Sequence, residues 1–582
     1  MIWCLKLIKK INQIKSWQVA IVIALIGLAV FFSGLNGGFQ GDDTDQIIKN
    51  EAIRSLSNIG HFFSSSTFWN GERLVGDFYR PMMTTTYAFI YALFGTNPIG
   101  FHVVQLILYM ACAFFLFLFL RTFFKPTVAL FLALIFLVHP INSQPVFSIP
   151  SMQEPLMFLS GISALYLLTI SNNTKRLFLV AFLLFLSLMS KETAVIFICL
   201  AVLYEFLYDR ERLFIFIKII SAPIILFLIL RISAVGLRNI TLSAPIDLLS
   251  FGERMITVPS IIMFYINKFF FPCELATSYY WTYKTITFEG FVIPLVLVLL
   301  LFVGFTYAGF LIYKNKNKKD FFAYIFFGLW TILGMSPHLQ IIALDMTACE
   351  TWFIVPMVGF LGILALIFKN FLPKVQPCIV LTLAIILLIL LGARTNIRGL
   401  DYQSQVTLSL KDITVTEKNY LAMNNLAKYY IDHNEPKKAQ QYAEKSVEYF
   451  PAVSNYINLG VIKMKQKDYV GAKEAYMKAL SFYPLRVTYE NIAIVNFAVG
   501  ESSENIAFLK KALSDFPNDS RLWNYLAIEE ARVGNNDGAK NAILNAYRVG
   551  PIPPELYDSI INKKPLDIPI TDTDKIIQIR WN

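Results

Sequence analysis

The run WQVAIVIALIGLAVFFSGL, residues 17–35, decides the class of fold, because it is long and apolar enough to cross a membrane. A helix needs about 20 mostly apolar residues to span the hydrocarbon core of a bilayer. Ten further runs of this kind follow before residue 394, and 56% of the 582 residues are hydrophobic while only 16% are charged. A soluble domain cannot bury that much apolar surface, so the sequence predicts a polytopic membrane protein.

The expected spans alternate with short basic loops, which indicates the orientation of the chain. The spans cover residues 17–35, 100–120, 127–140, 154–170, 177–190, 193–208, 213–231, 290–313, 321–336, 351–368 and 377–393. The positive-inside rule puts the loop lysines and arginines in the cytoplasm, so the N-terminus is expected inside and the C-terminal tail outside. The net charge of +11 resides mostly in these loops, and no nucleic-acid partner is expected.

Two other features of the membrane part are predicted from its apolar pattern. The N-terminal stretch MIWCLKLIKKINQIKSW is basic and lacks a small-residue cleavage site, which predicts a retained signal anchor. The stretches 79–94 and 255–271 are apolar but interrupted by polar residues and prolines. They are expected to be helices that lie on the outer membrane surface.

The tail beyond residue 394 is polar and repeats itself. Four segments end at Pro451, Pro484, Pro517 and Pro551, with spacings of 33, 33 and 34 residues, the period of a helix-turn-helix repeat. Small residues recur where the paired helices must touch: Ala427, Gly460, Ala493 and Ala527. The pattern predicts four tetratricopeptide repeats that stack into a superhelix with a concave groove. A plain helical spacer is the alternative.

Three carboxylates stand just beyond the first span, in GGFQGDDTDQIIKN, residues 37–50. Acidic residues are ordinary in an outer loop, where water solvates them, so Asp42, Asp43 and Asp45 alone do not define a site. The loop continues to YRP, which places Arg80 before the first surface helix. The context therefore favours a site at the outer membrane surface.

Further ionisable residues gather at the outer ends of the spans. Glu154 opens one span, and Lys191 stands between two spans that have almost no connecting loop. Such residues are costly at a span boundary unless they face a cavity or a partner. Because Lys191 opposes the positive-inside trend, it needs a local anion, either Glu192 or a lipid phosphate.

These residue types fit the transfer of a sugar from a polyprenyl-phosphate donor to a hydroxyl acceptor. A carboxylate, Asp42 or Asp43, would take the acceptor proton as the hydroxyl attacks the anomeric carbon. Arg80 and Lys191 would stabilise the charge that grows on the leaving lipid phosphate. A single displacement would invert the anomeric configuration. The sequence shows no Gly-rich loop for a nucleotide sugar, which favours a lipid-linked donor.

The order of the motifs resembles the GT-C glycosyltransferases, and most closely the transmembrane and tetratricopeptide repeat family of O-mannosyltransferases, relatives of the protein O-mannosyltransferases. The family's double acid, YRP, HP and SKE motifs are matched by Asp42–Asp43, by Tyr79, Arg80 and Pro81, by His139 and Pro140, and by Ser190, Lys191 and Glu192. Residues 269–280 and 348–360 look like two further family segments. The resemblance covers nearly the full length, including the repeats.

The resemblance implies an all-α fold, a GT-C membrane bundle of about 11 spans with a C-terminal tetratricopeptide superhelix. It implies catalytic roles for Asp42, Asp43 and Glu154, and binding of the donor lipid phosphate by Arg80, Lys191 and His139. The cavity lining is expected to include Tyr79, Glu192, Asp345 and Glu350. No essential metal and no other cofactor are expected, because His102 and His338 are isolated and no zinc-ligand spacing is present. The alternative is a divalent ion held by Asp42, Asp43 and Glu154, which requires these three carboxylates to converge.

Two family arginines are missing here. The family's Gly-Arg-Ala-acid run is replaced by Ser151, Met152, Gln153 and Glu154, and its Glu-Arg pair by Glu350 and Thr351. If those arginines hold the lipid phosphate, the donor or its geometry differs in this chain. Mannose is therefore not assumed to be the sugar.

The expected domains are a catalytic membrane part (1–394), a linker (395–418), four repeats (419–551) and a C-terminal tail (552–582). The expected partners are membrane lipids, the polyprenyl-linked donor, and an acceptor protein or glycan recruited by the repeats on the non-cytoplasmic side. Two other classes compete with an enzyme. A membrane-anchored scaffold would need only the repeats, and a transporter would place charges near the middle of its spans.

Overall fold

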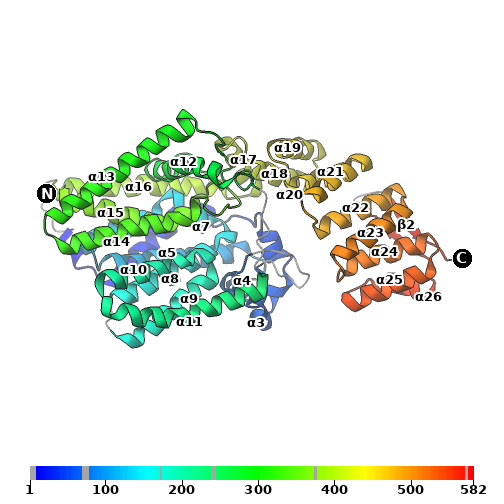
Figure 1. Ribbon diagram of the computed structural model, residues 1–582, viewed down its shortest axis with the longest axis horizontal. Coiled ribbons are helices and arrows are strands. Elements are labelled where there is room, and N and C mark those ends of the chain that lie inside the picture. Colours follow the sequence, from blue (N-terminus) through cyan, green and yellow to red (C-terminus); the bar gives the residue numbers. More distant parts are fainter. Residues whose placement is uncertain are drawn as a thin grey trace. The chain divides into compact units, whose positions relative to one another are not determined.

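The computed structural model describes residues 8–67, 78–170, 173–236, 244–371, 376–570 and 575–581. The first seven residues of the expected signal anchor lie outside this range. The chain forms two compact units, Met1–Glu417 and Lys418–Asn582. Both are helical, as Figure 1 shows, and each is described separately below.

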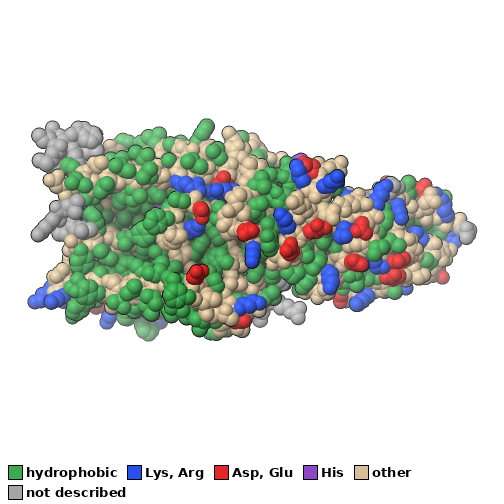
Figure 2. All heavy atoms as spheres, turned by 90° about the horizontal axis from the view of Figure 1, so that it is seen from above, with side chains coloured by type: hydrophobic (Ala, Val, Ile, Leu, Met, Phe, Trp, Pro, Cys, Tyr) green, Lys and Arg blue, Asp and Glu red, His purple; other side chains and the backbone are tan. Residues whose placement is uncertain are grey.

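All eleven expected spans fall on helices of the first unit. These helices are α2 (Ser16–Phe31), α5 (Pro98–Leu120), α6 (Pro126–Val138), α8 (Gln153–Thr169), α9 (Thr174–Ser190), α10 (Val195–Tyr208), α11 (Arg210–Val235), α13 (Ile293–Lys314), α14 (Lys318–Met335), α15 (Ile354–Phe371) and α16 (Pro377–Asp401). Many apolar side chains of α11, α13 and α16 are exposed, and Figure 2 shows hydrophobic side chains covering most of this unit's visible face. Such surfaces suit contact with lipid, so the chain is an integral membrane protein.

Not every one of these helices has the full length of a span. Among the described residues seven helices are long and apolar enough to cross a membrane, or eight if a bent pair counts as one. That pair joins α6 to the segment Pro140–Phe147 with a bend of 56°. The helices α8, α9 and α10 contain 17, 17 and 14 residues and end at polar joints.

Shorter helices connect or extend the long helices of the membrane unit. They are η1 (Phe32–Gly34), η2 (Thr44–Ile48), η3 (Glu51–Arg54), η4 (Leu56–Asn58), α3 (Ile59–Phe62), η5 (Pro140–Asn142), α7 (Gln144–Phe147), η6 (Ile149–Ser151), η7 (Glu192–Ala194), η8 (Phe288–Val292), η9 (Ser336–His338) and η10 (Glu350–Phe353). The two expected surface helices form as α4 (Pro81–Phe94) and α12 (Phe251–Phe270). Residues 395–418, suggested above as a linker, hold the end of α16 and the helix α17 (Gln405–Val415).

The second unit is a stack of helix pairs. The pairs are α18 (Tyr420–Asp432) with α19 (Pro436–Tyr449), α20 (Val453–Lys465) with α21 (Tyr469–Phe482), α22 (Arg486–Val499) with α23 (Ser502–Asp515), and α24 (Ser520–Arg532) with α25 (Asn536–Val549). The expected small residues sit at the contacts: a Cβ added to Gly460 would lie 2.4 Å from the Tyr476 ring. Ala427, Ala493 and Ala527 are fully buried. Gly500 ends α22 with φ of +89°, a conformation that favours glycine.

The residues expected as a tail close the repeat unit. Helix α26 (Pro554–Asn562) is followed by strands β1 (Leu566–Pro569) and β2 (Ile576–Ile579), which pair antiparallel with Leu566 opposite Ile579. Ile577 and Ile579 alternate with exposed residues and join the apolar core of the last repeats. The hairpin therefore covers apolar surface that the final helix pair would otherwise expose.

Candidate active site

The carboxylate pair Asp42–Asp43 lies in the loop between η1 and η2. Gly41 has φ of +55°, a left-handed turn that glycine adopts without strain. Its N–H donates to Gln405 Oε1 at 2.8 Å, and the Gln40 side chain donates to the Tyr402 carbonyl at 2.5 Å. The loop is therefore held by the turn between α16 and α17.

The two carboxylates have different environments. Asp42 is exposed, whereas the side chain of Asp43 is buried. Oδ2 of Asp43 accepts the Gln40 N–H at 2.8 Å, and its Oδ1 has no hydrogen-bond partner among the described residues. Burial raises the pKa of Asp43 well above its usual value; the Gln40 hydrogen bond lowers this pKa and the charge of Asp42 raises it further.

The pKa of Tyr87, on α4, responds to the charges of both acids and of Arg80. Burial raises the pKa of Tyr87, the charges of Asp43 and Asp42 raise it further, and Arg80 lowers it. These three side chains therefore lie within electrostatic reach of one tyrosine. The Tyr87 hydroxyl itself donates to a main-chain carbonyl at 2.8 Å and is not free to react.

Arg80 stands immediately before α4, where Pro81 takes the first helical position. A proline there costs no hydrogen bond, so the YRP motif suits the start of this helix. Its Nε lies 3.7 Å from Glu192 Oε2 but makes no hydrogen bond to the described residues, and its guanidinium lies 4.2 Å from the Phe78 ring centroid. The Tyr79 N–H donates to Glu192 Oε1 at 3.4 Å, while its buried hydroxyl binds a main-chain carbonyl.

Lys191 and Glu154 form an ion pair at the ends of two helices. Lys191 follows the last residue of α9, and Glu154 lies in the first turn of α8. Each charge suits the helix dipole at its position. The side chains are 9% and 3% exposed, so the pair is shielded from water. The anion that Lys191 requires is thus Glu154, and the neighbouring Glu192 faces Arg80 instead.

Asp345, in the loop before η10, belongs to the same cluster. Burial raises the pKa of Asp345, and the positive charges of Arg80 and Lys191 lower it. The carboxylate therefore lies within electrostatic reach of both cations. We call Arg80, Glu154, Lys191, Glu192 and Asp345 the charged cluster.

Among the predicted site residues outside the charged cluster, His139 and Glu350 are held by other groups of the protein. His139 is buried, with Nδ1 accepting the Ile141 N–H at 3.2 Å and Nε2 lying 2.9 Å from the Phe269 carbonyl. Both ring nitrogens are thus occupied by the main chain, and no nitrogen is left for a lipid phosphate. Glu350 is also buried, and its Oε1 accepts the Ala276 N–H at 2.8 Å and the Tyr279 hydroxyl at 2.7 Å.

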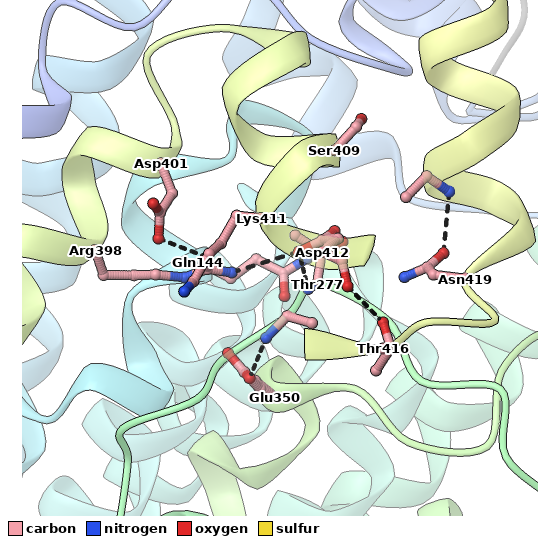
Figure 3. Close-up of polar contacts among 12 residues, drawn as sticks. Gln144, Thr277, Glu350, Arg398, Asp401, Ser409, Lys411, Asp412, Thr416 and Asn419 are labelled. Atoms are coloured by element: carbon pink, nitrogen blue, oxygen red, sulfur yellow. Dashed lines mark hydrogen bonds and ion pairs between the residues drawn. The ribbon is translucent and has the colours of Figure 1, made fainter. Parts of the chain in front are cut away.

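Glu350 lies instead beside a buried network around Arg398, which the sequence did not indicate (Figure 3). Arg398 is fully buried, 2.8 Å from Asp401 Oδ2 and 3.8 Å from Asp412 Oδ1. Asp412 of α17 accepts hydrogen bonds from the main chain and hydroxyl of Thr277. The network joins α16, α17 and the loop after α12. The only sequence signal was the i, i+3 spacing of Arg398 and Asp401 at the end of an apolar run.

Side chains of other kinds occupy the places of the missing family arginines. Met152 is buried in an apolar cluster that includes Tyr87 and Ile149. The Thr351 hydroxyl lies 3.1 Å from the sulfur of Cys349. Arg398, the buried arginine of Figure 3, lies within electrostatic reach of Glu350, although it comes from a different helix. Within the described ranges no group of three or more His, Cys, Asp or Glu side chains is placed to hold a metal ion.

The architecture is that of a polytopic helical membrane unit followed by tetratricopeptide repeats. The tetratricopeptide repeat family model matches residues 453–484. The chain is similar to the protein O-mannosyl-transferase F38B6.6 of Caenorhabditis elegans, with 23% identity over 445 residues, 72% of this chain and 61% of that protein. It is also similar to the human protein O-mannosyl-transferase TMTC4, with 28% identity over 145 residues, 22% of this chain and 19% of that protein.

These matches confirm the resemblance to transmembrane and tetratricopeptide repeat O-mannosyltransferases. The human protein O-mannosyl-transferase TMTC1 is 31% identical over 117 residues, 19% of this chain and 13% of that protein. The chain thus spans less than two thirds of the length of these relatives. Among solved structures, the crystal structure of MamA aligns with a TM-score of 0.24 and 20% identity, over 25% of this chain and 85% of that one.

Proposed function

We propose that the chain is a membrane glycosyltransferase that moves a sugar from a polyprenyl-phosphate donor to a hydroxyl of a protein acceptor on the non-cytoplasmic side, with inversion. The observation that carries the proposal is that the charges of Asp43, Asp42 and Arg80 all act on Tyr87, so the carboxylate pair lies within electrostatic reach of one cation of the charged cluster. An acceptor oxygen, Asp43 Oδ1, and a donor, Arg80 Nε, are both buried there without a hydrogen-bond partner among the described residues. A bound donor substrate would supply the partners that these two buried atoms lack.

The proposed reaction is a single displacement. The acceptor hydroxyl attacks the anomeric carbon while the exposed carboxylate of Asp42 takes its proton, and the bond from that carbon to the phosphate oxygen breaks. The departing polyprenyl phosphate gains negative charge, which Arg80 stabilises through its Nε and Lys191 through its charge. Glu192 and Glu154 hold these two cations in place before the donor binds.

Asp43 has a supporting role in this scheme. Its carboxylate is anchored to the Gln40 main chain, and its burial favours the protonated form. A protonated Asp43 would donate a hydrogen bond from Oδ1 to the sugar or the phosphate. The names of the relatives favour mannose as the sugar, and the proposal is mannose transfer to a serine or threonine hydroxyl.

The test is the transfer of radiolabelled sugar from native membrane lipids by cells that express the chain. Wild type is compared at matched amounts with Asp42→Asn, Asp43→Asn, Arg80→Ala and, as a control, Asp45→Asn, whose exposed carboxylate lies 4.0 Å from the Lys49 ammonium. Labelled product is expected with wild type and the control, and its loss with the other three. Equal labelling by all of them would contradict the proposal.

The second candidate is a membrane-anchored scaffold, which the repeat match favours. A scaffold needs no catalytic acids, so Asp42→Asn would leave its cellular phenotype intact, whereas deletion of residues 418–582 would abolish it. An enzyme requires both parts for full activity. Complementation of a deletion strain by these two variants separates the two candidates.

A further inference from the structure

The loop that carries Asp345 is closed by one buried glutamine. Gln340 is fully buried, and its side-chain amide donates to two main-chain carbonyls of the loop at 2.9 and 3.1 Å. Its Oε1 accepts the Leu344 N–H at 3.1 Å. These three hydrogen bonds join the start of the loop to the residues on both sides of Asp345. We call residues 340–347 the clamped loop.

The backbone of Gln340 has an uncommon conformation. Its φ of +58° lies in the left-handed region that favours glycine. A residue with a side chain persists there only where surrounding contacts hold it, and such residues cluster at ligand sites. Glycine would adopt this turn without strain but would lack the amide. The glutamine at this position therefore serves the three hydrogen bonds rather than the turn.

Neighbouring elements hold both ends of the clamped loop. Arg254 of α12 donates through Nε to the Gln340 carbonyl at 2.9 Å and through Nη2 to the Ile341 carbonyl at 3.4 Å. At the other end, the Thr347 N–H donates to the Tyr279 carbonyl at 2.9 Å. The loop is therefore tied to the rest of the membrane unit at both ends.

The clamped loop passes the cations of the charged cluster. The charge of Lys191 acts on Asp345 and also on His338 and Cys349, which lie just before and just after the loop. The charge of Arg80 acts on Asp345 as well. The course of the loop therefore keeps the Asp345 carboxylate within electrostatic reach of both cations.

Asp345 is the carboxylate of the charged cluster that is left to meet a ligand. Arg80 lies against Glu192, and Lys191 lies against Glu154. Asp345 is half-buried, so it retains partial access to solvent. An ionised carboxylate only accepts hydrogen bonds and repels a phosphate, so the part of a sugar-phosphate donor that suits it is a hydroxyl.

We propose that Gln340 is a positioning residue, which holds Asp345 where its carboxylate accepts a hydrogen bond from a sugar hydroxyl of the bound donor. The inference rests on the proposed function, in which Arg80 and Lys191 stabilise the donor phosphate. The sugar is joined to that phosphate through one oxygen, so its hydroxyls come next to a carboxylate that lies near both cations. A hydrogen bond to a carboxylate is stronger than one between neutral groups, and a site built around it discriminates against a lipid that lacks the hydroxyl.

The experiment compares the binding of two lipids to the purified full-length chain in nanodiscs, without an acceptor. One lipid is a synthetic polyprenyl-phosphate mannose, and the other is the same polyprenyl phosphate without a sugar. Displacement of a radiolabelled sample gives the affinity of each lipid, and the quantity compared is the ratio of the two affinities. The variants are Gln340→Gly, which keeps the left-handed turn and removes the amide, Asp345→Asn and the double variant. The matched control is Lys316→Gly, because Lys316 is exposed and has a φ of +57°.

We expect Gln340→Gly and Asp345→Asn each to lower the ratio of mannose-lipid affinity to phosphate-lipid affinity roughly 10-fold to 100-fold, the scale of a lost hydrogen bond to a charged group. The double variant should match Asp345→Asn, because Gln340 acts only through Asp345. Lys316→Gly should leave the ratio unchanged.

A ratio that stays at its wild-type value in either single variant would overturn the inference. Equal weakening of both lipids by Gln340→Gly would overturn it too, because that result is the mark of a merely structural role. A double variant whose loss is the product of the two single losses would also overturn it, as would a wild type that does not bind the mannose lipid. The expected ratios without any transfer of mannose to an acceptor would support the inference and overturn only the proposed transferase.

Discussion

Lys191 and Glu154 form a buried ion pair between the end of α9 and the start of α8, 37 residues apart in the chain. Neither side chain has substantial access to water. The pair fixes one cation of the charged cluster before any anionic ligand arrives. A buried charge that loses its partner is expensive, and this gives the first prediction.

Lys191→Met should lower the free energy of unfolding by about 3–5 kcal/mol, because Glu154 is left buried and unpaired. Removing both charges with Lys191→Met plus Glu154→Met should restore most of this loss while abolishing sugar transfer. Thermal midpoints in one detergent measure the effect. The control is Lys49→Met at the exposed pair with Asp45, which should change little. Equal midpoints for Lys191→Met and Lys49→Met would contradict the account.

Asp43→Asn should stabilise the chain at neutral pH. Burial raises the pKa of Asp43 in the folded protein, so the folded state holds this proton over a pH range in which the unfolded state has lost it. Stability therefore falls as pH rises from the unfolded pKa of about 4 to the raised folded pKa. The asparagine variant lacks this penalty, so its thermal midpoint should exceed that of wild type at pH 7 and approach it at low pH. If the difference in thermal midpoint between Asp43→Asn and wild type did not change with pH across this range, the ionisation of Asp43 would not be what destabilises the folded chain.

Arg80→Lys and Arg80→Ala should differ in a way that reports on phosphate recognition. Lysine keeps the positive charge but lacks the planar guanidinium and its donor Nε. In the wild-type chain this Nε makes no hydrogen bond to the described residues. We expect Arg80→Lys to retain part of the activity and Arg80→Ala to lose about 100-fold in kcat/KM, the scale of a lost charge-stabilising donor. Steady-state kinetics with varied donor measure both. A lysine variant as inactive as the alanine variant would indicate that geometry outweighs charge.

Arg398→Met should destabilise the membrane unit by about 3–5 kcal/mol, because Asp412 would be left buried with a charge and without its ion-pair partner. Burial raises the pKa of Asp412 and Arg398 lowers it, so the variant should also become more stable in mild acid, where this carboxyl is protonated. The control is Arg394→Met, a half-buried arginine that binds a main-chain carbonyl at 2.8 Å. Thermal midpoints at two pH values make the comparison.

Sugar transfer should persist in EDTA. The described residues contain no cluster suited to a metal ion. In the proposed reaction, Arg80 and Lys191 supply the positive charge that stabilises the leaving phosphate, so no metal ion is needed for this role. Transfer assays with and without excess EDTA, followed by added Mg²⁺ or Mn²⁺, check this. Loss of activity in EDTA that Mg²⁺ or Mn²⁺ restores would contradict the assignment.

Local patterns were enough to predict much of the architecture. The apolar runs identify the helices of the membrane unit, although not all of these helices have the length of a full span. The 33-residue period identifies the repeats without tertiary information. Span ends and motifs were enough to name the five residues of the charged cluster. The structure brings these residues together: Arg80, Lys191, Glu154, Glu192 and Asp345.

The pairings among distant residues could not be predicted in the same way. Glu154 and Glu192 are both acidic and both near span ends, so only the packing of α8 against α9 decides which one meets Lys191. The Arg398 network needs residues 277, 398 and 412 to converge, and α17 lies where composition suggested a linker. His139 matched a family motif, but its partners are main-chain atoms that no sequence pattern encodes.

The most direct test of the central claim is one comparison with purified protein. Wild type and Asp42→Asn, in equal amounts and with equal thermal midpoints, are given a synthetic polyprenyl-phosphate mannose and a Ser/Thr peptide. We predict mannosylated peptide from wild type and at least a 100-fold lower rate from the variant, the loss expected when a general base is removed. Equal rates would show that Asp42 is not the base, and no product from either protein with any polyprenyl-linked sugar would leave the scaffold as the function.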